Sequence, residues 1–528
     1  MATFEWIILL LLGAALLAAL ARRVGAPYPT FLAIGGALLA FVPDAPRWTL
    51  DPKLALTLLV APVLLDAAYD ASLRDLKINW RPIAGLVLAA VAVTIVAVAF
   101  TVHALVPGMP WAIAIALGAI VAPPDAAAAT AVMRQVRLPQ KLVTIVEGES
   151  LLNDVSALLV YRVAIMTMLA GHVGVAEVTP VLVLTVFGSL AAGFAFVALL
   201  MPFLSRVRDV PTALILQFSA TFGVWIAAEA IGLSGILTLV AYAMTISRRR
   251  GAAMPARMRV PVFAVWETVV FILNAFAFVL IGLQLRPIWE RLQHSGTGGD
   301  YLAIALAVLG VTILARVAWV LAYKFVLSPG HGRGSAGHRL GGAVVLSWAG
   351  MRGIVTLAAA FAIPEALAGG TPFPYRDLVL VCAFTVVLGT LVLQGLTLKP
   401  LIRLVNLRDD DPVGREVRLA RAEAYGALLA AIEGDDSLPA KLLRKEYAAV
   451  VESNQAGQSD EEAIDRHTGG PLRRRALSAA RVRADELRRD GSIGDAAFRV
   501  IVQEIDWAEL SAGGGIERRE GPGLSHTA

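Results

Sequence analysis

Apolar runs of about twenty residues follow one another through most of the chain, separated by short polar segments. A run of that length is what an α-helix needs to cross the hydrocarbon core of a bilayer. We therefore predict an all-α polytopic membrane protein with about thirteen membrane-spanning helices. The predicted spans are 4–22, 28–43, 52–71, 82–106, 111–133, 142–170, 179–204, 211–230, 232–247, 262–285, 301–326, 341–366 and 375–402.

The basic residues of the connecting segments gather on alternate loops. The rich set comprises Arg22, Arg23, Arg74, Lys77, Arg81, Arg134, Arg137, Lys141, Arg206, Arg208, Arg248, Arg249, Arg250, Arg257, Arg259, Lys324, Arg333 and Arg339, and the poor set Arg47, Lys53, Arg286, Arg291 and Arg376. Basic loops stay in the cytoplasm, so we expect the N-terminus outside and the C-terminus inside. Glu5 precedes the first apolar run and no basic segment does, which favours a retained helix over a signal peptide.

The character of the chain changes after residue 405. Stretches such as "REVRLARAEAYGALLAAI" are charged and amphipathic at helical spacing, which indicates solvated helices. We predict two domains, a transmembrane domain at 1–405 and a cytoplasmic helical tail at 406–528. The last segment, "SAGGGIERREGPGLSHTA", has the composition of a disordered end.

Composition agrees with a membrane protein. The 528 residues are 57% hydrophobic and 16% charged, with a mean hydropathy of +0.70, whereas soluble domains carry about 25% charged residues. The pI near 9.4 is accounted for by the basic loops on one membrane face, so a nucleic-acid partner is not expected. The single cysteine, Cys382, excludes an intramolecular disulfide.

The span 142–170 carries five polar residues between positions 147 and 154: Glu147, Glu149, Ser150, Asn153 and Asp154. A charged residue at the centre of a membrane helix costs about 2.5–3.5 kcal/mol on insertion scales, so such residues are usually functional. Ser150 and Asp154 lie four residues apart and share a helix face, and Glu149 and Asn153 share a neighbouring face. One face can address a substrate while the other holds a partner helix.

Two other spans contain helix-breaking residues near their middle. Pro123 and Pro124 interrupt the fifth span beside Asp125, because proline removes a backbone donor and clashes with the preceding turn. The twelfth span contains Gly350 and Gly353 on either side of Arg352, and a buried guanidinium needs a partner. These two spans are seven apart. We predict inverted six-helix repeats joined by the seventh helix, with interrupted helices in matching positions, as in secondary transporters.

Further polar residues lie in or near the spans. Asp66 in the third span could face the same cavity or could be a structural acid near the helix end, and the sequence leaves both open. Structural contacts or interfacial positions are expected for Arg162, Glu229, Glu267, Asn274 and Arg316.

Five segments of the chain together resemble one family. They are "EGESLLND" (147–154), "APPDAAAATAV" (122–132), "WAGMRGIVTLA" (348–358), "FILNAFAFVLIGLQL" (271–285) and "LVLQGLTLKPLI" (391–402). In this order they resemble the monovalent cation:proton antiporter-1 family, which comprises the NhaP-like and NHE-like sodium/proton exchangers. The tail is similar to that of the bacterial branch.

The resemblance implies roles for particular residues. Asp154 corresponds to the family's essential ion-binding aspartate, Asn153 to its neighbouring asparagine, Asp125 to the acid at the unwound part of the fifth helix, and Ser150 to a coordinating serine. The resemblance also implies a buried ion pair between Glu149 and Arg352. It implies a homodimer, and Asn-Asp members are generally electroneutral.

Two positions depart from the family pattern. Pro124 stands where the family usually has threonine, so only its backbone carbonyl remains for coordination. Asp66 stands where the family often has glutamate, and its side chain is one methylene shorter.

We expect a secondary transporter that exchanges Na⁺, or Li⁺, for H⁺ across the plasma (inner) membrane of a bacterium by alternating access. Oxygen ligands suit a small hard cation, so no cofactor is expected and the metal ion is cargo. A carboxylate that binds either a proton or a cation, but not both, makes exchange depend on pH.

Three alternatives use the same residues or the same membrane setting. A K⁺/H⁺ antiporter would use the same site. A channel would need a filter-like segment, and none is present in the sequence. An intramembrane aspartyl protease would need a Gly-x-Gly-Asp type signature, which is also absent, so the protein is not expected to be an enzyme.

Overall fold

The structure is a computed structural model. It describes residues 2–43, 52–133, 138–170, 175–250, 255–294, 298–327, 336–367, 371–407, 412–455, 470–490, 501–502 and 504–508. Within these residues the elements are helices. Among them there is also one isolated β-bridge, between Ala366 and Pro372. The chain divides into two compact units, Met1–Arg408 and Asp409–Ala528. The boundary predicted after residue 405 lies close to this division.

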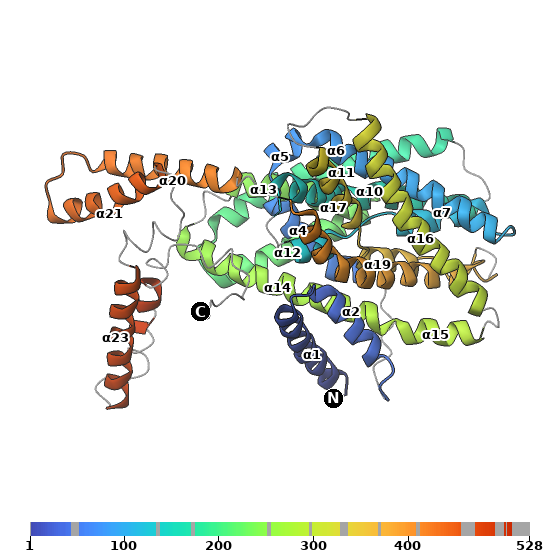
Figure 1. Ribbon diagram of the computed structural model, residues 1–528, viewed down its shortest axis with the longest axis horizontal. Coiled ribbons are helices and arrows are strands. Elements are labelled where there is room, and N and C mark those ends of the chain that lie inside the picture. Colours follow the sequence, from blue (N-terminus) through green and yellow to red (C-terminus); the bar gives the residue numbers. More distant parts are fainter. Residues whose placement is uncertain are drawn as a thin grey trace. The chain divides into compact units, whose positions relative to one another are not determined.

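The first unit contains the apolar helices (Figure 1). In chain order they are α1 (Ala2–Val24), α2 (Tyr28–Leu39), α3 (Pro52–Ala55), η1 (Leu56–Val60), α4 (Ala61–Asp70), α5 (Leu73–Ile78), α6 (Trp80–Ala84), η2 (Gly85–Ala90), α7 (Val91–Leu105), α8 (Trp111–Val121), α9 (Ala126–Met133), α10 (Gln140–Ala170), α11 (Val175–Arg206), α12 (Val210–Ala230), α13 (Gly235–Arg250), α14 (Ala256–Leu283), α15 (Leu285–His294), α16 (Gly298–Ala322), η3 (Tyr323–Leu327), α17 (Ala336–Trp348), α18 (Ile354–Phe361) and α19 (Arg376–Val405).

Each predicted span overlaps one of these helices or a run of consecutive ones. By length and composition, eight helices of the described ranges can cross a membrane. They are Glu5–Val24, Trp80–Leu105, Gln140–Leu169, Leu182–Arg206, Val210–Ala230, Met258–Glu290, Gly299–Phe325 and Arg376–Val405. The count of thirteen spans and the inverted repeats stay predictions. The short helices α5 and α15 were not predicted.

The interruptions of the fifth and twelfth spans are confirmed. The fifth span is divided into α8 and α9, and the twelfth into α17 and α18. Each break leaves a few residues without helical hydrogen bonding in the interior of the unit, where backbone polar groups need other partners.

Helices α8 and α19 form the centre of the first unit. Of the most apolar window of α19, 72% of the residues are buried, against 22% for α11. Figure 1 shows α19 beside α16, and these two helices pack together. A helix that is apolar all round lies either in a protein core or in lipid. Because α19 is mostly buried and α11 is mostly exposed, we place α19 in the core and α11 against lipid.

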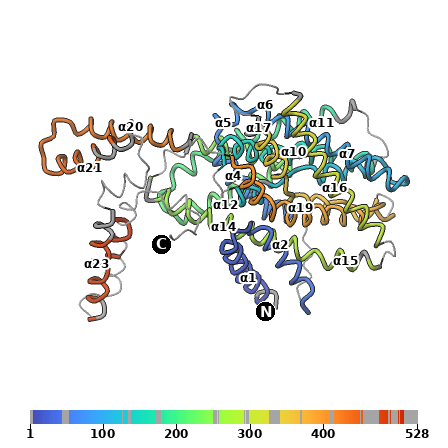
Figure 2. The backbone as a smooth tube through the Cα atoms, in the orientation of Figure 1, coloured from blue at the N-terminus to red at the C-terminus, as the bar shows by residue number. Residues whose placement is uncertain are grey.

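The second unit contains α20 (Pro412–Ala431), α21 (Leu438–Gln455) and α23 (Gly470–Arg489). Helices α20 and α21 pack side by side as a hairpin (Figure 2), with the rings of Tyr425 and Tyr447 5.1 Å apart. Helices were predicted here, whereas the predicted disordered end at 511–528 lies outside the described residues.

Candidate ion-binding site

The break between α8 and α9 is formed by Pro123 and Pro124, which cannot donate a backbone hydrogen bond. Asp125 follows them and caps the next helix, because its Oδ1 accepts a hydrogen bond from the backbone N–H of Ala127 at 2.8 Å. The prolines end one half-helix and the aspartate begins the other. The carboxylate is thereby fixed at the break.

The break between α17 and α18 meets the first break directly. The backbone N–H of Asp125 donates to the carbonyl oxygen of Met351 at 2.6 Å. Gly353 lies against the side chain of Asp125, and a Cβ built at this glycine would overlap the aspartate's carboxyl group. Only glycine therefore permits the two interrupted helices to approach this closely.

Arg352 binds the backbone of the breaks. Its Nε donates to the carbonyl of Val121 at 2.9 Å, its Nη2 to that of Ala122 at 3.2 Å, and its Nη1 to that of Gly350. The side chain is fully buried. Its positive charge lies at the C-terminal end of α8, where the helix dipole and the unpaired carbonyls favour a cation. The guanidinium thus satisfies carbonyls that the break has freed.

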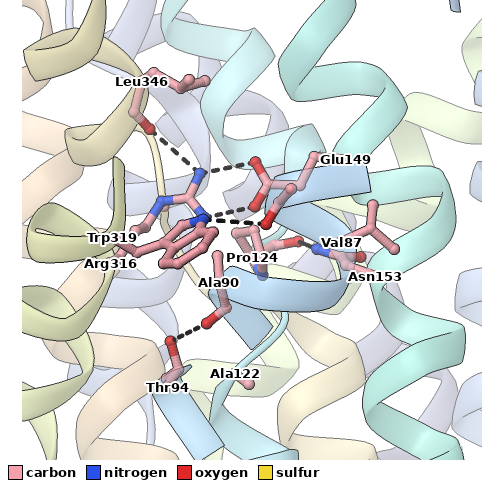
Figure 3. Close-up of polar contacts among 12 residues, drawn as sticks. Val87, Ala90, Thr94, Ala122, Pro124, Glu149, Asn153, Arg316, Trp319 and Leu346 are labelled. Atoms are coloured by element: carbon pink, nitrogen blue, oxygen red, sulfur yellow. Dashed lines mark hydrogen bonds and ion pairs between the residues drawn. The ribbon is translucent and has the colours of Figure 1, made fainter. Parts of the chain in front are cut away.

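Glu149 pairs with Arg316 of α16, not with Arg352. The carboxylate binds this guanidinium at two points, with Oε1 2.5 Å from Nη1 and Oε2 2.8 Å from Nη2 (Figure 3). Both side chains are almost completely buried. Arg316 also donates to the carbonyl of Leu346 on α17 at 3.2 Å.

The predicted Glu149–Arg352 ion pair is therefore wrong in its partner. A bidentate pair satisfies both carboxylate oxygens with one guanidinium, which leaves Arg352 free for the backbone carbonyls of the breaks. Arg316 was predicted to make a structural contact, and it does. The same holds for Arg162 and Glu229, whose charged groups lie 3.1 Å apart.

Asn153 joins α10 to the first break. Its side-chain Nδ2 donates to the carbonyl oxygen of Pro124 at 3.2 Å, and the residue is fully buried (Figure 3). Its Oδ1 has no hydrogen-bond partner within the described ranges. One turn further, Ser156 Oγ donates to the carbonyl of Val87 in η2 at 2.9 Å. Helix α10 is thereby tied to the first break and to η2.

A cavity of about 340 Å³ lies where these elements meet. Five of the residues singled out in the sequence line it, from three different helical segments: Asp66, Pro124, Asp125, Ser150 and Asp154. Asn153 does not line the cavity and lies behind its wall. Asp154 is 6% exposed, so it lines a part of the cavity that solvent hardly reaches.

Four more acidic or amide residues line the same cavity: Asp70, Glu147, Glu267 and Asn274. Sequence analysis assigned Glu267 and Asn274 to structural or interfacial contacts and gave Glu147 no role. Their signal was the same as that of Asp154, a polar residue inside an apolar run. What the sequence lacked was the direction in which the side chains on α10 and α14 point. The cavity wall, as far as it is described, includes acids and amides but neither Lys nor Arg.

At the breaks, the carboxylates of Asp125 and Asp154, the hydroxyl of Ser150 and the backbone at Pro124 line one shared space. Such hard oxygen donors are the groups that bind a small dehydrated cation. Buried carboxylates without a fixed cationic partner also bind protons readily.

The sequence matches the family model described as "Sodium/hydrogen exchanger, transmembrane" over residues 8–404. The chain belongs to this family. As a sodium/hydrogen exchanger family member with several apolar helices, it is a multi-pass membrane protein, and its family is one of transporters.

Named relatives of this exchanger family member are similar over most of its length. An antiporter of Bacillus pumilus (strain SAFR-032), named for exchange of sodium, potassium, lithium and rubidium for H⁺, is 33% identical over 383 residues, covering 70% of this chain and 57% of the relative. The uncharacterized Na⁺/H⁺ exchanger YjcE of Escherichia coli (strain K12) is 31% identical over 471 residues, covering 85% and 83%. This chain therefore spans less than two thirds of the Bacillus protein.

The fold is also similar to a solved structure. The sodium proton antiporter MjNhaP1 from Methanocaldococcus jannaschii, determined at pH 8, superposes with a TM-score of 0.60 over 77% of this chain and all of that one, at 16% identity. At this identity the likeness shows a common fold.

Proposed function

We propose that this protein exchanges a monovalent cation, Na⁺ or Li⁺, for H⁺ across the plasma membrane by alternating access. The observation that carries the proposal is the position of Asp125 and Asp154, which line one cavity where two interrupted helices cross. Both are carboxylates in a membrane interior, and neither has an ion-pair partner within the described ranges. Such a carboxylate is neutralised either by a proton or by a cation.

In this proposal Asp154 is the principal site of exchange and Asp125 its partner at the break. Ser150 and the break carbonyls complete the oxygen ligands, and Asp66 contributes from the facing wall. Asn153 positions the break by holding the Pro124 carbonyl, as the 3.2 Å hydrogen bond suggests. No cofactor is needed, and the transported ions are the only metal involved.

The moving part of the transporter is a core of α8, α9, α10, α16, α17, α18 and α19. Buried polar contacts support this grouping because they join its members to each other. Glu149 binds Arg316, and Arg352 binds the end of α8 and, through its backbone N–H, Thr390 of α19 at 3.0 Å. Buried contacts of this kind resist separation, so the linked helices move as one body. The remaining helices serve as the scaffold of a homodimer.

Membrane orientation follows from the distribution of basic loops, with the N-terminus outside and the tail in the cytoplasm. Exchange is electroneutral if one Asp154 carboxylate alternates between one proton and one cation. The alternative of an intramembrane aspartyl protease would give Arg352 no role, whereas here Arg352 binds the backbone carbonyls of the breaks.

The test is proton flux in proteoliposomes, reported by a pH-sensitive dye, with sodium, lithium and potassium added in turn. We expect dequenching by sodium or lithium in the wild type and none in Asp154→Asn. Asp300→Asn makes the same change at an exposed acid in the first turn of α16 and should retain exchange. Full activity of Asp154→Asn would overturn the proposal.

Potassium is the second candidate cation, since the Bacillus relative is named for potassium as well as sodium. Dequenching by potassium alone, lost in Asp154→Asn, would keep the site and the mechanism and would replace the proposed cation.

A further inference from the structure

Among the described residues, those that line the cavity at Asp125 and Asp154 are exposed at one end of it. Along α14, Glu267 is exposed and Asn274 is half-buried, whereas Leu280 and Ile281 further along the helix are 1% and 0% exposed. The first two residues line the cavity and the last two lie beyond it. The open end is therefore the one nearer the N-terminus of α14, which the basic residues of the preceding loop assign to the cytoplasm.

The opposite wall shows the same gradient. Asp70 at the end of α4 is exposed, Asp66 is half-buried, and Leu59 in η1 is 2% exposed. All three line the cavity, so its deep end lies at η1 and at the α17–α18 break. The wall at η1 is apolar, whereas the open end is acidic.

A second crevice lies beyond this deep end. It measures about 10 Å³ and is lined by Ala55, Leu280, Ile281, Gln284, Ile354, Leu357, Ala358 and Phe361. A cavity needs about 10–15 Å³ to hold one water molecule, so this crevice is closed to a hydrated ion. Ile354 lines both the crevice and the main cavity. Its side chain thus separates the two spaces.

Ile354 is also next to the proposed ion site in the chain. It is the first residue of α18, and Gly353 before it lies against the carboxyl group of Asp125. A change in the position of that carboxyl group displaces Gly353 and, through one peptide unit, Ile354. The ion site and the side chain of Ile354, which separates the two spaces, therefore belong to one short segment.

We infer that the crevice between α18, α3 and the C-terminal end of α14 is the outward half of the transport route, and that Ile354 is the residue that closes it. In the conformation described, the seal is shut and the cytoplasmic end is open. Alternating access requires the reverse state, in which α18 moves away from α3 and α14 and water reaches Asp125 past Ile354. This inference rests on the proposed function.

Cysteine labelling tests the route. Cys382 is the only cysteine and is fully buried, so Cys382→Ala provides a background for single-cysteine variants. Ala358→Cys places a thiol in the crevice. Ala360→Cys is the matched control, because it is on the same helix, is equally buried, and lines neither space.

The reagent is a membrane-impermeant methanethiosulfonate, added to right-side-out and to inside-out vesicles. Two-state proteins commonly populate their minor state at about 0.1–10%, so we expect slow labelling of Ala358→Cys from the outside, about tenfold faster than at Ala360→Cys. Sodium and pH should change this rate, because they shift the population of the outward-open state. Equal rates at the two positions, or labelling of Ala358→Cys only from the inside, would overturn the inference.

Ile354→Ala tests the seal itself. Removing the side chain should accelerate labelling of Ala358→Cys from the outside and should allow proton leak without added cation. Ile363→Ala removes the same side chain from a buried position outside both spaces, and it should do neither. If Ile354→Ala and Ile363→Ala have the same labelling rate, Ile354 does not close the route.

Exchange by the wild type and by the Cys382→Ala background is measured in the same membranes. An absence of cation-dependent proton flux in both overturns the proposed function. Active exchange combined with no outside labelling of Ala358→Cys overturns only the inferred route.

Discussion

Asp125 donates its backbone N–H to the carbonyl of Met351 at 2.6 Å, and this hydrogen bond joins the two interrupted helices where each has lost its own helical pairing. The prolines before Asp125 end α8 at this point, and Gly353 after Arg352 leaves room for the aspartate side chain. Arg352 completes it by covering the last carbonyls of α8. The breaks are thus satisfied by each other, and the aspartate side chain is left for the cavity.

Replacing Gly353 by alanine should abolish exchange without preventing insertion of the protein. The added Cβ overlaps the carboxyl group of Asp125, so the two breaks must separate or the carboxylate must turn away from the cavity. Gly223→Ala is the control, because a Cβ there meets nothing within 4 Å. Proton flux and the yield of folded protein in detergent are the measurements. Wild-type flux from Gly353→Ala would show that the crossing tolerates a wider spacing.

The pairing of Glu149 with Arg316 predicts a specific rescue. Removing one member leaves a buried unpaired charge, so Glu149→Leu or Arg316→Met should each lower the free energy of unfolding by about 3–5 kcal/mol. Combining them removes both charges and should recover most of that loss. Thermal unfolding in detergent measures each variant.

The control for this cycle is Arg352→Met combined with Glu149→Leu. Because Arg352 binds backbone carbonyls, adding Glu149→Leu should not restore the free energy of unfolding that Arg352→Met removes. If Glu149→Leu rescued Arg352→Met and did not rescue Arg316→Met, the result would support the Glu149–Arg352 pair that the family resemblance implies.

The sequence was sufficient to predict the apolar helices, the two breaks and part of the cavity lining. Pro123 and Pro124 end a helix by local stereochemistry, and a carboxylate within an apolar run is conspicuous without a structure. The partner of Glu149 was not predictable in this way. Two arginines are buried nearby, Arg316 on α16 and Arg352 in the α17–α18 break, and only packing decides which one a carboxylate reaches.

The acidic residues of the open end were missed for a related reason. A single residue such as Glu267 near the start of a membrane helix is compatible with an interfacial position or with a cavity wall. The rotation of α14 about its axis distinguishes these, and that rotation depends on contacts with distant helices such as α2. Periodicity could not supply it, because α14 is apolar on several faces.

Glu267→Gln should raise the KM for sodium and leave the maximal rate unchanged. Glu267 lines the open end of the cavity, where negative charge raises the local concentration of cations. The effect should be largest at low ionic strength and should fade near 1 M salt, where the Debye length is about 3 Å. Glu290→Gln is the matched control, because Glu290 pairs with Arg286 on α15 and does not line the cavity. A loss of maximal rate that does not depend on salt would instead make Glu267 part of the exchange site.

Protons and sodium should compete at Asp154, which fixes the sign of the pH dependence. As the pH falls, a larger fraction of the carboxylate is protonated and unavailable to the cation, so the apparent KM for sodium rises. For one proton against one cation the rise approaches about tenfold per pH unit once most sites are protonated. The maximal rate at saturating sodium should change little over the same range. Initial rates of exchange at several sodium concentrations and pH values measure both quantities. A maximal rate that falls with pH while the KM stays constant would place the titrating group outside the ion site, and the tail helices α20 and α21 would then be the first segment to delete.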